Sequence, residues 1–189
     1  MPMETHLSRN ELEDIFWRAT MICLGLDPDS KDEAVQKRVR ISWPSSETGN
    51  TDWERNENVV FLRISPGLDE YGTLSDISYA HDADTDVLKE VVQYHRNHQI
   101  HWVCYGPDSD SDADRIRIGI LRDAIRASMR KQNIAVQSHI REPIRMPEQD
   151  ESGEWWERCD LTAQCYELVT REYAADYIDV PPSIITTHE

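Results

Sequence analysis

Lysine is scarce in this chain, and the balance of charge is strongly acidic. Only four lysines stand among the 20 basic residues, against 36 acidic ones, and the formal net charge is −16. A protein that grips DNA along its backbone neutralises phosphates with clustered Lys and Arg, so this balance excludes a conventional DNA-binding mode. An acidic surface can instead keep a protein soluble, repel DNA that must slide past it, or imitate the charge of DNA.

Long apolar runs and targeting signals are missing as well. No run of about 18 apolar residues is present, which is the length that a membrane-spanning helix needs, so we predict no membrane partner. The start, Met1-Pro2-Met3-Glu4, lacks the basic and then apolar pattern of a signal peptide, and we expect the protein to be made in the cytosol. With 189 residues, 39% of them apolar, the chain is long enough to bury one core.

The four cysteines show no C-x-x-C spacing. Cys23, Cys104, Cys159 and Cys165 lie mostly in apolar surroundings, which favours buried free thiols over a metal site or a disulfide framework. If Cys159 and Cys165 share one extended strand, a rise of about 3.3 Å per residue puts them roughly 20 Å apart. That separation excludes a disulfide between them.

Signatures of catalysis and metal binding are also missing. The sequence has no Gly-rich phosphate loop, no G-x-S-x-G and no H-E-x-x-H. The acidic run from Asp108 is similar to a calcium loop, but its sixth and twelfth positions are Ala113 and Gly119, where Gly and a bidentate Glu are needed. Histidines recur every three residues up to His98 and His101, which places these two on opposite sides of an expected strand. We therefore predict no catalytic site, no metal and no cofactor.

Two helices are expected. Ser8 and Glu11 have the spacing of a capping box, and apolar residues follow at helical spacing toward Gly25, which predicts a helix over about residues 8–24. The stronger signal predicts one long helix over about 111–132, with carboxylates in its first turn that favour the helix N-terminus. The stretch from Lys31 to Arg40 is compatible with a short amphipathic helix or with a strand.

The long helix is expected to carry two apolar stripes and a basic ridge. One stripe is formed by Ala113, Ile116, Ile120, Ala124 and Ala127, its neighbour by Ile118, Leu121, Ile125 and Met129, and the ridge by Arg115, Arg122, Arg126 and Arg130. Together the stripes exceed the usual apolar width of about 100°. One stripe should pack on the sheet, and the other either on a second surface such as another subunit or under a loop of the same chain.

Alternating and β-branched residues predict the strands. They are Val59–Ile64, Val87–Tyr94, Gln99–Tyr105, Ile134–Ile140 and a clearly alternating strand from Trp155 to Tyr166. The second and third either meet in a hairpin at residues 96–98 or form one long bent strand. We predict an α+β fold with a mixed, mainly antiparallel sheet of four to five strands, on which the long helix packs. It forms a single domain over residues 1–172, with long loops at about 44–58 and 66–86 and a C-terminal extended arm at 173–189.

From Asn58 to Arg171, about three-fifths of the chain, these elements follow a recognisable order. A strand ends in Tyr105-Gly106, and an acidic helix start, the long helix and a further strand follow. Next come the link Ile140-Arg141-Glu142-Pro143-Ile144-Arg145-Met146-Pro147 and the strand Trp155-Trp156-Glu157-Arg158-Cys159-Asp160-Leu161. This pattern resembles the neck and tail-terminator (tail-completion) proteins of tailed bacteriophages. The stretches before Val59 and from Asp69 to Asp86 lie outside the resemblance.

The resemblance implies a structural virion protein of the neck and tail, and not an enzyme. It implies a homo-oligomeric ring, commonly six-fold, that joins the tail tube to the neck connector proteins and ends tube growth. DNA would pass through its lumen without specific binding, and assembly would take place in the host cytoplasm. Intersubunit contacts are expected at Arg115, Arg122, Arg126, Arg130, Arg141, Arg145, Arg158, Ile184 and Ile185, and lumen-facing carboxylates at Asp108, Asp110 and Asp112. Each arginine taken alone is also compatible with an ordinary surface residue.

Two alternatives from other classes stay open at this point. An acidic protein of this size could bind and inhibit a basic host protein, as a mimic of DNA charge, and it would then be monomeric or dimeric. A small enzyme with a site that has no recognisable motif is the second alternative. The oligomeric state separates both of them from a ring subunit.

Overall fold

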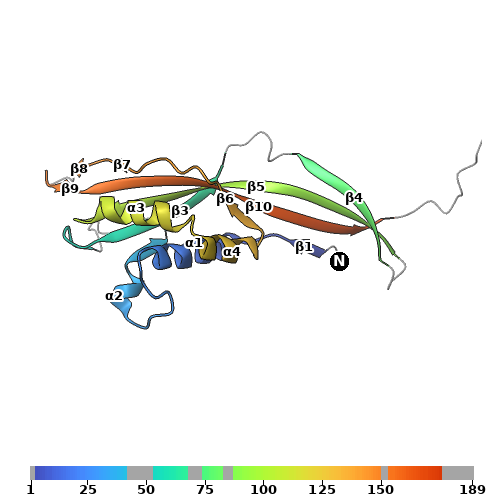
Figure 1. Cartoon of the computed structure of the whole chain (residues 1–189), viewed down its shortest axis with the longest axis horizontal. Helices are drawn as coiled ribbons and strands as arrows, with labels where there is room; N and C mark the ends of the chain where they lie inside the picture. The colour runs from blue at the N-terminus through green and yellow to red at the C-terminus, as the bar shows by residue number, and fades with distance from the viewer. Residues whose placement is uncertain (1–2, 42–52, 68–73, 83–86, 150–152, 176–189) are drawn as a thin grey trace, which may run out of the picture.

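A computed structural model describes residues 3–41, 53–67, 74–82, 87–149 and 153–175 (Figure 1). The elements are β1 (Met3–Thr5), α1 (Arg9–Cys23), α2 (Glu33–Gln36), β2 (Val39–Ile41), β3 (Val59–Pro66), β4 (Ser75–Asp82), β5 (Val87–Tyr105), α3 (Ser109–Gly119), α4 (Asp123–Arg130), β6 (Ile134–Val136), β7 (Ile144–Arg145), β8 (Glu148–Gln149), β9 (Trp155–Trp156) and β10 (Arg158–Ala174). Over these ranges, no helix combines the length and the apolar character that crossing a membrane requires.

Two long antiparallel strands, β5 and β10, form the centre of the sheet. All 17 residues of β10 pair with β5, from Arg158 opposite Tyr105 to Ala174 opposite Lys89. β3 and β4 pair with successive halves of β5 on its other edge, while β7, β6 and β1 pair with β10. β2 joins β3 in parallel. The sheet is therefore mixed and mainly antiparallel, as predicted, but it has eight strands rather than four to five.

Several predicted boundaries are wrong. Val87–Tyr105 is one continuous strand, so the hairpin alternative is excluded. The predicted loop at 66–86 contains β4, whose side chains from Ser75 to His81 are all exposed. Ile77 and Tyr79 alternate there with Asp76 and Ser78, but so short an alternation among polar residues is a weak strand signal. β6 covers only the first three residues of the expected Ile134–Ile140 strand. β10 continues to Ala174, beyond the end of the predicted strand at Tyr166.

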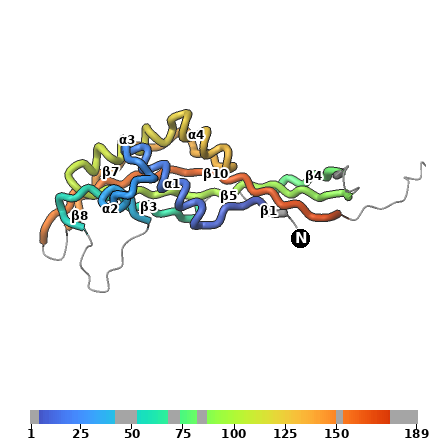
Figure 2. Tube along the Cα trace, turned by 90° about the horizontal axis from the view of Figure 1, so that it is seen from below, coloured from blue at the N-terminus to red at the C-terminus, as the bar shows by residue number. Residues whose placement is uncertain are grey.

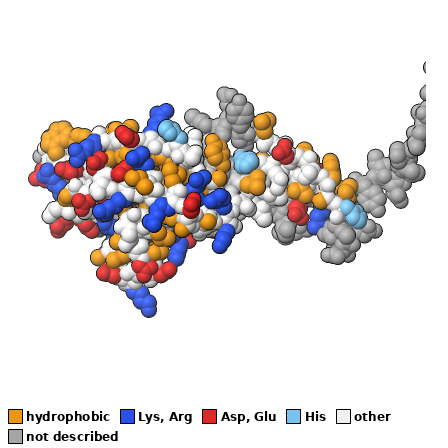
Figure 3. Space-filling view, in the orientation of Figure 1, with side chains coloured by type: hydrophobic (Ala, Val, Ile, Leu, Met, Phe, Trp, Pro, Cys, Tyr) orange, Lys and Arg blue, Asp and Glu red, His pale blue; other side chains and the backbone are white. Residues whose placement is uncertain are grey.

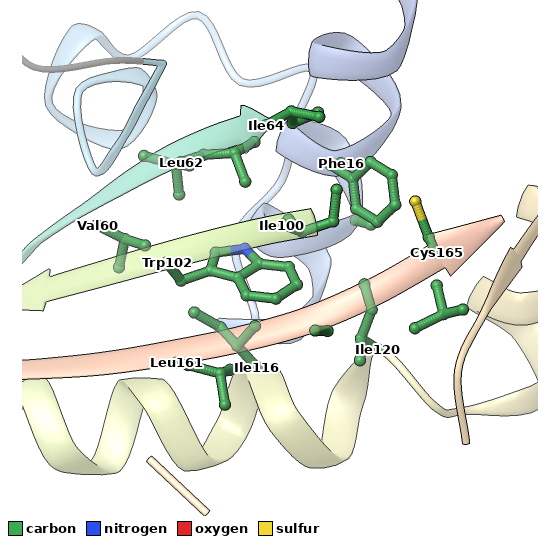
Figure 4. Close-up of a cluster of buried hydrophobic side chains, with 14 of the residues drawn as sticks. Phe16, Val60, Leu62, Ile64, Ile100, Trp102, Ile116, Ile120, Leu161 and Cys165 are labelled. Carbon is green, nitrogen blue, oxygen red and sulfur yellow. The ribbon is translucent and has the colours of Figure 1, made fainter. Parts of the chain in front are cut away.

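The main core lies between one face of the sheet and the helices α1, α3 and α4, which cover only the half of the ribbon nearest Tyr105 (Figure 2). Trp102 of β5 is fully buried among side chains from both layers, including Phe16 and Ile116 (Figure 4). Its indole Nε1 donates a hydrogen bond of 2.8 Å to Thr20 Oγ1, and the Thr20 hydroxyl donates to the Phe16 carbonyl at 2.7 Å. The buried polar tip of the tryptophan is thus satisfied inside the core.

Helix α1 confirms the prediction for the N-terminus. Ser8 caps the helix, since its side chain accepts from the Glu11 amide while the Glu11 carboxylate accepts from the Ser8 amide. The stretch from Lys31 to Arg40 contains both of the expected alternatives, the one-turn helix α2 and the start of β2. These short elements bring Arg38 against the start of α3.

The predicted long helix is wrong, because the chain leaves helical geometry between α3 and α4. The break follows Gly119, where a Cβ would lie 2.7 Å from the Cys23 Sγ of α1, and Arg122 adopts an extended ψ of 141°. Glycine is a poor helix former and permits this close approach of the two helices. The break also turns α4 relative to α3, so Ile116 of one stripe and Met129 of the other both face the core, whereas Ile118 is 59% exposed.

A smaller apolar cluster lies on the opposite face of the sheet, near the Tyr105 end. Phe61 and Tyr105 pack there with Trp53 and Trp156, and the centroid of the Trp53 ring is 4.8 Å from that of Phe61 and 5.7 Å from that of Tyr105. Trp53 belongs to the predicted loop at 44–58, of which residues 44–52 lie outside the described ranges. The described end of this loop therefore covers part of the second face of the sheet.

Beyond the described helices the sheet continues as a part that we call the sheet extension (Figures 1 and 2). It consists of β4, residues 87–97 of β5 and residues 166–174 of β10, with β1 paired to residues 170–172 of β10. Glu167 anchors its base. The carboxylate is 1% exposed and accepts from the Leu7 amide at 2.7 Å and from Arg96 Nη2 at 2.6 Å, while His98 Nε2 lies 3.1 Å away.

Candidate assembly surfaces

The arginines predicted to form one ridge lie on the outer side of α3 and α4. The Arg115 side chain is 60% exposed, and its Nη1 lies 3.7 Å from Asp112. Arg122, Arg126 and Arg130 recur every fourth residue along α4 and its start, so they share one side of that helix. Within the described ranges none of these three has a carboxylate within 4 Å, and Arg130 donates only to the Arg126 carbonyl. They are cations without an acidic partner on a chain of net charge −16.

Basic side chains gather over the helix-covered half of the molecule on the face shown in Figure 3. The sheet extension shows few of them there. Because the helix breaks at residues 120–122, the alignment of Arg115 with the α4 arginines no longer follows from helical spacing. The predicted single ridge is therefore better described as an α4 group of three arginines, Arg122, Arg126 and Arg130, with Arg115 on the preceding helix.

The three carboxylates predicted to face a lumen have different environments. Asp112 is 1% exposed and forms an ion pair with Arg38, so its predicted role in lining a lumen is wrong. A buried carboxylate keeps its charge by pairing, and its partner lies 74 residues away along the chain. Asp108 and Asp110 are exposed. Asp108 also accepts a hydrogen bond from the Asn58 amide at 2.9 Å, which holds the start of α3 against β3.

The remaining predicted interface arginines also differ. Arg158 is held by its own chain, since it donates to Asp160 at 2.8 Å and to Glu148 at 2.9 Å. The hydrogen bonds to Asp160 raise the pKa of the Arg158 guanidinium above its ordinary value. Arg141 and Arg145 are exposed and have no ion pair in the described part of the chain. Ile184 and Ile185 lie outside the described residues.

Three surface clefts among the described residues are small. They have volumes of about 210, 190 and 170 Å³, below the range of about 300–1,000 Å³ that is typical of small-molecule sites. His101 lines the third cleft, on the helix-free face, where its Nε2 lies 3.2 Å from Ser65 Oγ and its Nδ1 3.3 Å from Thr162 Oγ1. Burial lowers the pKa of His101. A serine-histidine pair of this kind lacks the carboxylate that orients the base in a hydrolase triad.

The histidines of β5 do not converge on one point. His98 contacts Glu167 on the helix-covered side, whereas His101 lies on the other face, which confirms the prediction that they point to opposite sides. No group of three or more metal-binding side chains occurs among residues whose positions are described.

Sequence reasoning missed the uncovered face of the sheet extension. Ile77 and Tyr79 of β4 are 58% and 64% exposed. Register places Tyr79 beside Glu90 of β5, and Glu90 in turn beside Tyr173 of β10. In the sequence, Ile77 and Tyr79 alternate with Asp76 and Ser78, as expected of a strand, but the polar residues around them make this alternation hard to recognise.

A sequence profile described as "Phage neck terminator protein" matches residues 10–189, nearly the whole chain. The chain belongs to this family. No curated protein matches it. The matched range confirms the resemblance that the Tyr105-Gly106 and Trp155–Leu161 motifs carry, and it extends that resemblance to α1, α2 and the stretch before Val59.

Membership in the neck terminator family defines the protein as a structural component of the bacteriophage virion, located at the neck and tail end. A neck terminator contacts other neck and tail proteins. The surfaces available for such contacts are the α4 arginines, the exposed carboxylates at the start of α3 and the uncovered face of the sheet extension.

Proposed function

We propose that this neck terminator assembles into a ring, six-fold as the resemblance implies, that closes the tail tube. One side of the ring would contact the tail tube protein and the other the neck connector, and tube growth would end when the ring binds. The subunits would be made in the host cytoplasm and enter the virion during assembly. DNA would pass through the lumen without specific binding.

The observation that carries the proposal is the α4 group of arginines. Arg122 and Arg130 are exposed and Arg126 is half-buried, and none of the three has a carboxylate partner within the described residues, so together they suit a contact with an acidic surface. Another copy of the chain offers such a surface. When a basic patch of one copy meets a different, acidic patch of the next, the contact is heterologous, and such contacts generate a ring where the rotation between copies closes.

The acidic balance of the chain supports passage of DNA rather than binding. Asp108 and Asp110 stay exposed at the start of α3, and like charges oppose adhesion to phosphates. These two carboxylates are the remaining candidates for the lumen. The predicted contacts of Arg115, Arg141, Arg145, Ile184 and Ile185 complete the proposed set, whereas Arg158 already has two carboxylate partners in its own chain and carries no part of the argument.

The test is the state of assembly of purified protein, alone and mixed with isolated tail tubes. Size exclusion coupled to light scattering should give a ring mass, and electron microscopy should show annular particles, free or at tube ends. The variant Arg122→Glu with Arg126→Glu should abolish the ring and leave the circular dichroism spectrum unchanged. A control with the same charge change, Lys31→Glu with Arg63→Glu, alters exposed cations away from α4 and should assemble normally.

Two results would contradict the proposal. A protein that stays monomeric at all concentrations and on tail tubes forms no ring, and tight binding of such a monomer to a basic host protein would instead support the acidic-inhibitor alternative. Normal rings from the double α4 variant would refute the arginine interface alone.

A further inference from the structure

The sheet extension continues the ribbon that forms the core, but the helices of its own chain do not reach it. On the side that continues the helix-covered face, register brings together a set of apolar side chains: Ile77, Tyr79, Leu88, Val92, Tyr94 and Tyr173. Tyr79 is 64% and Tyr173 38% exposed. The side chains of Asp76 and Ser78 point to the opposite face. Leu88, Val92 and Tyr94 are half-buried, and the same register places Arg171 and Glu4 on this face. Exposed apolar side chains that gather in this way can form an interaction site.

Glu90 lies in the middle of this apolar face. Its neighbours across the strands are Tyr79 and Tyr173, and its side chain is half-buried. Glu90 forms no ion pair with a cation of the described ranges. Lys89 pairs with Glu172, and Arg171 lies over the Tyr94 ring, 5.5 Å from its centroid. A carboxylate framed by two tyrosines without a basic partner is complementary to an arginine supplied from outside.

We propose that this face of the sheet extension, with Glu90 at its centre, docks on the α3–α4 surface of a second copy of the chain. That surface provides Arg122 and Arg126, which form no ion pair within the described residues, and the apolar side chain of Ile118, which is 59% exposed. The neighbour's helices would cover the second half of the ribbon as the chain's own helices cover the first. The inference rests on the proposed ring and names the two surfaces that form its contact.

The outer edge of β4 favours a partner as well. Within the described residues β4 pairs only with β5, so its other edge is open. An open edge of eight residues with exposed Ile77 and Tyr79 is prone to uncontrolled pairing unless something shields it. A neighbouring subunit seated over the extension would shield this edge in the assembled state.

The test is a charge exchange between the two surfaces. Glu90→Arg and Arg126→Glu should each lower ring formation at least tenfold, measured by light scattering and by counting annular particles with and without tail tubes. Combining both changes in one chain should restore rings, because every interface would again pair one arginine with one carboxylate, with their two positions exchanged. The matched control is Asp76→Arg, which makes the same charge change on the opposite face of the extension and should assemble like wild type.

The outcomes separate this inference from the proposed function. If wild-type protein forms rings and Glu90→Arg forms them equally well, the docking surface is wrong and the ring stands. If Asp76→Arg disrupts rings as strongly as Glu90→Arg, or the double exchange fails to restore them while both single variants stay folded, the pairing of these two surfaces is refuted. If wild type forms no ring, both proposals fail.

Discussion

The carboxylate of Glu167 offers the sharpest test of how the fold is held together. It joins the chain just before α1 to both central strands, because it accepts from the Leu7 amide and from Arg96, and Arg96 also donates to the Leu7 carbonyl at 2.7 Å. The variant Glu167→Gln keeps the shape of the side chain and removes its charge. The sheet extension begins at this point, so the change also probes how firmly the extension is anchored.

The expected loss follows from the burial of the two partners. Removing one member of a buried ion pair costs about 3–5 kcal/mol. Glutamine keeps one accepting oxygen, and the Arg96 side chain is 32% exposed and can reach water, so we expect a loss of about 2–3 kcal/mol in the free energy of unfolding at pH 7. For a chain of this length that corresponds to a fall in Tm of roughly 5–10 °C. Glu142→Gln, on an exposed side chain, should stay within about 0.5 kcal/mol of wild type.

The pH dependence supplies the refutation. Burial alone would raise the pKa of Glu167, but hydrogen bonds from Leu7, Arg96 and His98 outweigh it, and the pKa lies below its ordinary value of 4.5. The stabilisation by this carboxylate is therefore complete above pH 4.5 and is lost as the pH falls through the lowered pKa. In urea unfolding, the difference between wild type and Glu167→Gln should shrink below pH 4.5. An unchanged difference down to pH 3, or no difference at pH 7, would show that the charge does not stabilise the fold.

Two further predictions concern the packing. Gly106→Ala should lower the free energy of unfolding by about 2–3 kcal/mol, because φ is +101° and a Cβ would lie 2.6 Å from Asn58 Oδ1. Gly25→Ala, at φ +77° with no atom within 4 Å, should lower it by only about 1 kcal/mol. Equal losses of the two variants in urea unfolding would argue against a steric cause. Burial raises the pKa of all four cysteine thiols. Native protein should therefore react slowly with Ellman's reagent at pH 8, whereas unfolded protein should react at once with four equivalents of the reagent. A rapid reaction of the native protein would contradict the burial of the thiols.

Local signals allowed the correct predictions. The capping box at Ser8 and Glu11 depends on residues three apart, and it places the start of α1 correctly. The alternation from Cys159 to Cys165 reflects the two faces of one strand, and the structure buries one set and leaves the other partly exposed. In both places neighbouring residues contain the complete pattern, so tertiary contacts did not have to be known.

The failures come from contacts between distant segments. The break after Gly119 depends on the approach of Cys23 from α1, and the burial of Asp112 depends on Arg38, which directly precedes β2. Neither partner can be identified from helical spacing within 111–132. The apolar face of the sheet extension combines residues of three strands, of which only Ile77 and Tyr79 are close together in the sequence. Periodicity within one segment cannot reveal a surface of this kind.

The unbroken pairing of β5 with β10 fixes the length of the sheet. Seventeen pairs without a bulge span about 55 Å at about 3.3 Å per residue. A slip by one residue would turn every side chain to the wrong face, so the two strands cannot slide past each other to adjust their length. Strain applied at one end of the ribbon can therefore only bend or twist it. A neighbour bound at the tip would be held at a fixed distance from the core, and the diameter of the assembled particle would be set by the length of a hydrogen-bonded ladder.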